Sequence, residues 1–252
     1  MPETGSLVDI LDAPGLAPKY DKRLAIIVPY RDRAEHLGKF IPHMISYFER
    51  DKLDRNIAYS IHFVEQMGDE KFNRGKLLNS GFEIAKDDAD YFCFHDVDYL
   101  PVWADYSYCD RPTHIIWHGL LPRYQYPGFI GGVVLFNKQD FVKVNGFSND
   151  YWGWGEEDEE LRERCFLVGL SVDRRDGTFT RLDHENAGFK PDGSRPAEGD
   201  TNKKKRLERA KRLGELYMQD GLNTLEYRLS DASKVSIGAQ ELDNVFYNKV
   251  EI

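Results

Sequence analysis

The chain has 252 residues, which is enough for one large α/β domain or two small ones. Its formal net charge of −9 argues against non-specific binding to nucleic acid, which requires a basic surface. No apolar run approaches the length of a transmembrane segment, and residues 1–23 lack the cationic start and apolar centre of a signal peptide. The sequence therefore predicts a soluble protein.

Three widely spaced cysteines, Cys93, Cys109 and Cys165, fit neither a disulfide framework nor a zinc-binding pattern. The chain also contains no Asn-x-Ser/Thr sequon. Both features favour a reducing compartment, so we expect a cytoplasmic location. A disulfide between Cys93 and Cys109 is left open as an alternative.

The first half of the chain predicts alternating strands and helices after a loose N-terminal lead-in over residues 1–23. Residues 24–28 are a continuous apolar run that ends at Pro29, which is typical of a strand buried on both faces. Helical spacing follows over 35–50, a second strand over 57–64 and a second helix over 72–86. This order predicts an α/β fold, with a mostly parallel sheet flanked by helices, in one domain over residues 24–252.

Basic side chains follow the first predicted strand. Arg31 and Arg33 lie at its expected carboxyl end, which is the edge where open α/β sheets bind ligands. Guanidinium groups match phosphate oxygens bidentately, so this pair suits a phosphate. Arg74, at the start of the second helix, could reach the same pocket. The alternative is that all three are solvent-exposed residues at helix starts.

An aromatic strand over residues 91–95 leads into two carboxylates, Asp96 and Asp98. If the strand continues through them, both side chains leave one face and repel each other unless a cation lies between them. Such a pair can hold a divalent metal that in turn holds a diphosphate, although the motif alone also occurs as a solvated turn. His184 is a further candidate ligand, because imidazole joins carboxylates in Mn²⁺ and Zn²⁺ sites, although a lone histidine is usually structural.

The second half of the chain carries a Trp-Gly-Trp-Gly stretch at residues 152–155, followed by acidic residues that open a helix. The helix dipole explains some of these carboxylates, but aromatic faces flanked by carboxylates also suit a sugar ring. A strand is expected over 129–136, with two glycines where the backbone passes close to a ligand or another strand. A basic helix over 201–219 and two or three short strands over 222–252 complete the prediction.

Taken in order, several segments of the chain resemble the β-1,4-galactosyltransferases, glycosyltransferase family 7. The segments are Ile27–Arg33, Phe72–Phe82, Asp96–Asp98, Gly131–Val133, Trp152–Asp158 and Gly221–Thr224. The Phe-Asn-Arg and Trp-Gly-Trp-Gly-x-Glu-Asp blocks are specific to this family. Within it, the chain most resembles the members that transfer galactose to xylose. The resemblance implies a GT-A fold, a Rossmann-like mixed and mostly parallel sheet flanked by helices, with a mobile Trp loop.

The resemblance also implies roles for individual residues. The positions that match the binding site for the UDP-sugar donor are Pro29, Tyr30, Arg31, Arg33, Phe72, Arg74, Asp96, Val97 and Trp154. Those that match the acceptor site are Trp154, Gly155, Glu157 and Asp158. Within that acidic pair Asp158 matches the general base and Glu157 its catalytic neighbour. Asp98 and His184 match ligands of Mn²⁺.

The activity that this resemblance implies is an inverting, Mn²⁺-dependent transfer of galactose or GalNAc from a UDP-sugar to a hydroxyl of an acceptor sugar, in a β-1,4 linkage. The expected partners are the UDP-sugar and a glycan or glycoside acceptor, with xylose-terminated glycans among the candidates. The alternatives are a metal-dependent phosphohydrolase and a non-catalytic module that binds a glycan or a nucleotide.

Three features depart from the family pattern. Arg181 and Leu182 stand where the family has a further metal ligand, so Asp183 or water would complete the coordination shell. Phe129 stands where many members have a tyrosine, which removes a hydroxyl near the second carbon of the donor sugar and would admit GalNAc beside galactose. Animal members are anchored in the Golgi membrane, so the Golgi lumen is the alternative to a cytoplasmic location.

Overall fold

The computed structural model describes residues 22–51, 57–118, 120, 124–126, 128–183 and 197–252. The predicted N-terminal lead-in therefore lies almost entirely outside the described residues. The main sheet has eight strands in the order β7-β5-β6-β3-β1-β2-β10-β9, and β4 pairs with β8 in a separate small sheet. In the main sheet the strands are β1 Arg23–Tyr30, β2 Ala58–Gln66, β3 Tyr91–His95, β5 Thr113–His114, β6 Val133–Asn137, β7 Asp173–Arg174, β9 Arg228–Ile237 and β10 Gln240–Glu251.

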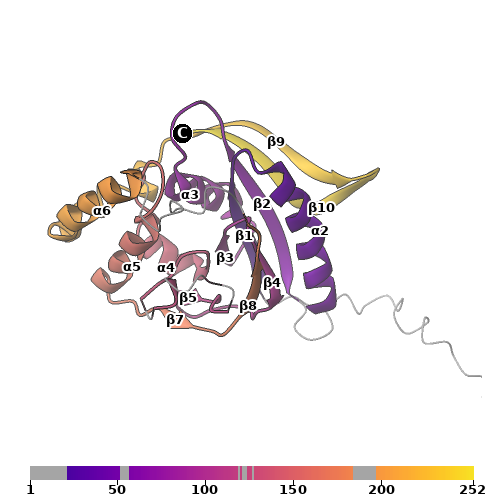
Figure 1. Cartoon of the computed structure of the whole chain (residues 1–252), viewed down its shortest axis with the longest axis horizontal. Helices are drawn as coiled ribbons and strands as arrows, with labels where there is room; N and C mark the ends of the chain where they lie inside the picture. The colour runs from indigo at the N-terminus through magenta and orange to yellow at the C-terminus, as the bar shows by residue number, and fades with distance from the viewer. Residues whose placement is uncertain (1–21, 52–56, 119, 121–123, 127, 184–196) are drawn as a thin grey trace, which may run out of the picture.

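Helices flank the sheet, as the α/β prediction requires. They are α2 Ala34–Asp51, α3 Arg74–Ala85, α4 Lys138–Lys143, α5 Glu157–Leu167, α6 Ala197–Ala210 and α7 Leu213–Leu216. Figure 1 shows α2 and α3 on opposite sides of the central strands. One buried apolar cluster joins α2 to β1 and β2, and a second joins α3 to the other face of the same strands.

The central strands run in parallel, which brings their carboxyl ends to one edge. β1 pairs in parallel with β2 and with β3, and β10 pairs in parallel with β2. Helix α3 packs closely on this layer because a Cβ atom at Gly81 would lie 2.2 Å from Cγ2 of Ile27. The sheet is mixed because β6 runs antiparallel to β3 and β9 antiparallel to β10.

Several predicted boundaries were wrong. β1 continues through Pro29 to Tyr30; its ladder with β3 ends at Ile27, so only one side of β1 is still paired at the proline. The strand expected from residue 129 begins at Val133, since Gly132 has a φ of +84°. The basic helix expected over 201–219 is divided into α6 and α7 by a turn at residues 211–212.

The C-terminal region also differs from the prediction of two or three short strands. β9 and β10 form one long hairpin whose inner strand joins the main sheet beside β2 (Figure 1). β9 is an edge strand that is exposed on both faces, so its sequence lacks the apolar alternation that would have revealed it.

All three cysteines are buried and free, so the alternative of a Cys93–Cys109 disulfide is wrong. Within the described residues no helix combines the length and apolar character needed to cross a membrane.

Candidate active site

Arg74, the first residue of α3, joins two acidic segments that lie far apart in the sequence. Its Nε donates a hydrogen bond to Oδ1 of Asp96 at 2.7 Å, and its Nη1 to Oε1 of Glu157 at 3.4 Å. The Arg74 side chain is only 14% exposed, so these charges interact in a largely desolvated setting. The structure therefore brings the predicted donor residues Arg74 and Asp96 together with the predicted acceptor residue Glu157.

The start of α3 is held in place by the asparagine before it. The side chain of Asn73 accepts a hydrogen bond from the Lys76 backbone N–H and caps the helix. Its Nδ2 donates to the carbonyl of Asn149 at 2.7 Å, and its backbone N–H donates to the Gln66 side chain at the end of β2. Arg74 therefore projects from a helix start that is tied to both the sheet and the segment before the Trp loop.

The Asp-x-Asp pair lies in a turn, which corrects the idea that a continuing strand places both carboxylates on one face. β3 ends at His95, and the Tyr99 N–H donates to the carbonyl of Asp96 at 3.3 Å. His95 is fully buried between the carbonyl of Asp96 and the hydroxyl of Tyr106, each 2.9 Å away. Burial raises the pKa of Asp96 to about 6, and the neighbouring charge of Asp98 adds to this rise while Arg74 opposes it.

The acidic pair stands at the start of α5. Glu156 precedes it with a φ of +82°, a left-handed conformation that redirects the chain from the Trp loop into the helix. Burial raises the pKa of Asp158 to about 8, with further contributions from the charges of Glu157 and Glu159 and an opposing one from Arg74. A carboxylate whose pKa lies near neutrality is suited to proton abstraction.

Gly131 leaves the space that the Asp158 carboxylate occupies. A Cβ atom at residue 131 would lie 2.2 Å from Oδ2 of Asp158 and 2.6 Å from Cζ of Phe129. The glycine does permit a close approach, but the neighbours are side chains, a predicted catalytic carboxylate and the ring of Phe129, rather than the predicted ligand or second strand. That ring is itself buried and stacks on Tyr124 with centroids 4.9 Å apart.

Helix α6 contacts the backbone of the Trp loop, residues 152–155, which the sequence analysis did not foresee. The Asn202 amide donates to the carbonyls of Trp152 and Trp154, both at 3.2 Å, and Arg206 donates to Glu156 at 2.6 Å. The signal was present, because residues 202, 206 and 209 share one helix face, but the run of lysines suggested only a solvated surface. The predicted mobility of the Trp loop stays a prediction.

Further predicted donor residues lie at the carboxyl end of β1 and in the loop before α3. Arg31 donates to the carbonyl of Glu70 at 2.7 Å, and its guanidinium lies 5.4 Å from the centre of the Phe72 ring. Tyr30 is buried and packs edge-on against Tyr247 of β10. Pro29 precedes Tyr30 in β1, and Val97 lies between Asp96 and Asp98 in the turn after β3. Arg33 is half-buried.

The predicted metal ligands are Asp98 and His184, and His184 lies outside the described residues. The described residues that precede His184 lie beside Asp98. β4 Tyr99–Trp103 pairs with β8 Thr178–Arg181, and the Leu182 N–H donates to the carbonyl of Asp98 at 2.7 Å. Asp183 is 91% exposed and ion-paired to Arg181 at 2.7 Å, so it is not directed at a shared metal with Asp98 in this arrangement.

The donor set nevertheless fits a Mn²⁺ ion. No group of three or more potential ligands occurs among the residues that the structure describes, so any complete shell involves His184 or solvent. The negative charge of Asp98 acts on Asp96, and the guanidinium of Arg74 partly compensates Asp96. Two carboxylates and an imidazole three residues past the end of β8 are donors that Mn²⁺ accepts.

Two family descriptions match adjoining parts of the chain. Residues 16–110 match the N-terminal region of glycosyl transferase group 7, and residues 111–186 match a description that reads N-terminal domain of galactosyltransferase. The mouse protein beta-1,4-galactosyltransferase 7 is 36% identical over 225 residues, which cover 86% of this chain and 64% of the mouse protein. The chain spans roughly half to two thirds of the length of the curated relatives it matches.

Solved structures give the same assignment. The catalytic domain of Drosophila beta1,4galactosyltransferase 7 in complex with xylobiose superposes with a TM-score of 0.74 and 30% identity, over 92% of this chain and 94% of that one. A mutant of the same enzyme in complex with manganese, UDP-Gal and xylobiose gives a TM-score of 0.73 and 30% identity over the same shares. This chain therefore belongs to the β-1,4-galactosyltransferases of glycosyltransferase family 7 and has their GT-A fold.

Proposed function

We propose that this protein is an inverting, Mn²⁺-dependent glycosyltransferase that moves galactose from UDP-galactose to a hydroxyl of an acceptor sugar in a β-1,4 linkage. The observation that carries the proposal is the bridge that Arg74 forms between Asp96 and Glu157. Through it, the carboxylate expected beside the donor diphosphate and the carboxylate expected beside the acceptor face one site. A transfer reaction needs both sides held within reach of each other.

Asp158 acts as the general base in this proposal, and Glu157 as a positioning residue. The base takes the proton of the acceptor hydroxyl as that oxygen attacks the anomeric carbon of the donor sugar and the bond to the diphosphate breaks. The elevated pKa of Asp158 supports this role, because a base must hold the proton more tightly than an ordinary aspartate does. Arg74 forms an ion pair with Glu157 and so holds the Glu157 carboxylate, next in sequence to Asp158, in place.

Asp98 and His184 are proposed to hold Mn²⁺, with Asp96 close by. The ion supplies Lewis-acid stabilisation of the negative charge on the departing UDP. The proposed donor contacts are Arg31, Arg33 and Phe72, and Trp154 with Gly155 would close over donor and acceptor and exclude water. A relative has been solved with manganese and UDP-Gal, which supports this choice of metal and donor.

The acceptor class we propose is a xylose-terminated glycan or xyloside. Its support is the xylobiose bound in two structures of one relative, the Drosophila enzyme and its mutant, which is 30% identical to this chain. UDP-GalNAc is proposed as a second donor, because Phe129 lacks a hydroxyl near the second carbon of the sugar. The cytoplasm is the proposed compartment, and the Golgi lumen is the alternative.

An assay of donor consumption tests the proposal against the two alternatives. The protein is incubated with UDP-galactose and a β-xyloside, with Mn²⁺ or with EDTA, and free galactose and the disaccharide product are quantified separately. The proposal predicts a Mn²⁺-dependent disaccharide with little free galactose. Release of galactose 1-phosphate, quantified in the same reactions, at the same rate with and without acceptor would instead indicate a phosphohydrolase, because cleavage at phosphorus leaves the sugar phosphorylated. Tight UDP binding without turnover of any acceptor would indicate a binding module.

A further inference from the structure

A pocket of about 380 Å³ lies at the opposite end of the central strands from the candidate active site. Arg23 at the start of β1 lines it, whereas Tyr30 at the end of β1 faces the active-site edge. Seven residue steps at about 3.3 Å each put the two ends roughly 23 Å apart. The pocket therefore serves no group of the transfer site.

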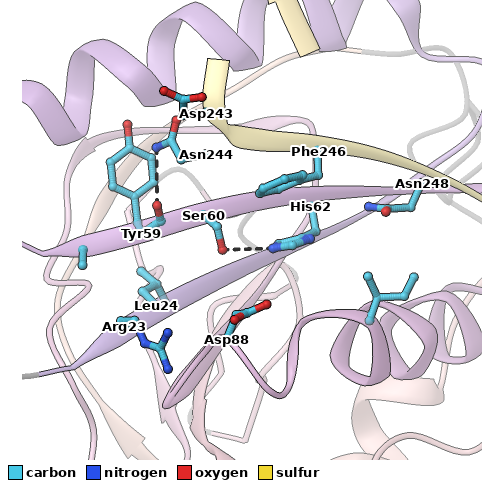
Figure 2. A pocket seen from close by; sticks show the side chains of 12 residues that line it. Arg23, Leu24, Tyr59, Ser60, His62, Asp88, Asp243, Asn244, Phe246 and Asn248 are labelled. Atoms are coloured by element: carbon cyan, nitrogen blue, oxygen red, sulfur yellow. Dashed lines mark hydrogen bonds between the residues drawn. The ribbon is translucent and has the colours of Figure 1, made fainter. Parts of the chain in front are cut away.

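The pocket exists because α3 covers only part of its sheet face. The helix ends at Ala85, and its apolar residues pack against the carboxyl halves of β1 and β2. Beyond that end the same face presents Ser60 and His62 of β2 beside Asn244, Phe246 and Asn248 of β10 (Figure 2). Asp88, three residues past the helix, lies on the other side of the pocket (Figure 2).

His62 is the residue that most strongly indicates a ligand site in this pocket. The residue is 8% exposed, its ring stacks on Phe246 with centroids 4.9 Å apart, and Nε2 lies 2.9 Å from Oγ of Ser60. Its Nδ1 is buried and has no hydrogen-bond partner among the described residues. A buried nitrogen without a partner is costly, so an imidazole placed here needs an explanation beyond packing.

The polar groups around this stacked pair are rich in acceptors. Asn244 and Asn248 each use their NH₂ group on a backbone carbonyl of β2, at 3.4 Å and 3.2 Å, which leaves their amide oxygens as acceptors. Among the described residues, Asp88 has no cation within ion-pair distance, and Asp243 pairs with Lys234 at 2.9 Å. Arg23 lies 3.9 Å from Asp90, so its charge is already shared.

The amide oxygens of Asn244 and Asn248 and the carboxylate of Asp88 favour a ligand that donates hydrogen bonds over an anion, and the stacked rings of His62 and Phe246 favour one that also has apolar C–H surface. A sugar ring combines hydroxyl donors with such C–H surface. We propose that the pocket between the amino ends of β1 and β2 and the strand β10 binds a neutral saccharide, with the stacked rings of His62 and Phe246 as its apolar wall and Asp88 and Asn244 as acceptors. The inference does not depend on the transfer reaction.

Isothermal titration of the full chain with two neutral disaccharides, xylobiose and lactose, tests this proposal in the absence of UDP and Mn²⁺. Asp88→Ala and Asn244→Ala are the test variants, because neither side chain is part of the buried core and both proteins should fold. Asp87→Ala is the matched control, as a neighbouring exposed carboxylate outside the pocket, and Trp154→Ala reports binding at the transfer site instead.

The expected result is saturable binding of at least one disaccharide, weakened about ten-fold or more by each test variant and unchanged by Asp87→Ala and Trp154→Ala. The absence of binding by both sugars would overturn the proposal. So would binding that is lost in Trp154→Ala but kept in Asp88→Ala, which would assign it to the transfer site. Binding of ethanolamine without either disaccharide would show that the pocket takes an organic cation and would also overturn it.

Discussion

The side-chain amide of Asn202 lies 3.2 Å from the carbonyl oxygen of Trp154, the residue expected to close over donor and acceptor. The same amide also reaches the carbonyl of Trp152, and Asn202 is only 3% exposed. The neighbouring Arg206 holds Glu156, directly before the acidic pair. Helix α6 thus supports the backbone of the Trp loop and the first residues of α5 from one side.

Replacing Asn202 should therefore impair transfer without affecting the nucleotide site. In Asn202→Ala, two backbone carbonyls lose a buried donor, an effect of about 1–3 kcal/mol that corresponds to a loss of roughly five-fold to 150-fold in kcat/KM. UDP affinity should stay within about two-fold, because no predicted donor phosphate ligand contacts Asn202. Lys203→Ala, an exposed neighbour on the same helix, is the control. An equal effect of the two substitutions on transfer would exclude a specific role for Asn202.

The metal assignment predicts that Asp98→Asn loses at least about ten-fold in Mn²⁺-dependent UDP affinity, since an amide is a weaker ligand than a carboxylate. Titrations of UDP with and without Mn²⁺ measure the difference directly. Asp87→Asn serves as the control for a change of one surface charge. If Asp98→Asn binds UDP and Mn²⁺ as the parent does, Asp98 is not a ligand.

The sequence predicted the elements that are formed by apolar burial, but not those that depend on polar contacts between distant segments. The apolar runs of β1 to β3 and the helical spacing of α2 predicted the central layers, because burial imposes a period that residues display directly. The local geometry after His95 was not predictable in the same way, since it depends on hydrogen bonds from Tyr99 and Tyr106. The α6 contacts to the Trp loop join distant segments, so the shared face of residues 202, 206 and 209 did not reveal their partners, and β9 is an exposed edge without apolar alternation.

Donor choice provides a separate test at Phe129. A Cβ atom at residue 131 would contact both the Phe129 ring and the Asp158 carboxylate, so the two side chains lie close to one point, and the Phe129 ring carries no hydroxyl there. We therefore predict that UDP-GalNAc and UDP-galactose are used at comparable rates, and that Phe129→Tyr lowers the rate with UDP-GalNAc relative to UDP-galactose. The ratio of kcat/KM values for the two donors is the measurement. A strict preference for UDP-galactose that Phe129→Tyr leaves unaltered would contradict the prediction.

The buried histidines predict a loss of stability in mild acid. Burial lowers the pKa of His62 to about 4, partly opposed by Asp88, so the folded state holds it neutral at pH 7. In the unfolded chain a histidine titrates near pH 6.5. The unfolded state therefore binds more protons, and the free energy of unfolding falls by about 2 kcal/mol per such residue between pH 6.5 and pH 5.

Urea unfolding at about pH 7 and pH 5 measures this contribution. In His62→Gln the decrease in unfolding free energy between the two values should be smaller than in the parent by about 2 kcal/mol. An identical pH dependence in His62→Gln and the parent would show that His62 is protonated in the folded protein as readily as in the unfolded one.

The most direct test of the proposed transfer compares Asp158→Asn with Glu157→Gln in the same two assays, transfer rate and Mn²⁺-dependent UDP affinity. Adjacent residues at a helix start point about 100° apart, so their carboxylates can hardly serve one hydroxyl in the same way. Asp158→Asn should lose about a hundred- to ten-thousand-fold in transfer rate and keep its UDP affinity, whereas Glu157→Gln should lose less. Near-normal transfer by Asp158→Asn, or an equal collapse of its UDP affinity, would contradict the assignment of Asp158 as the base.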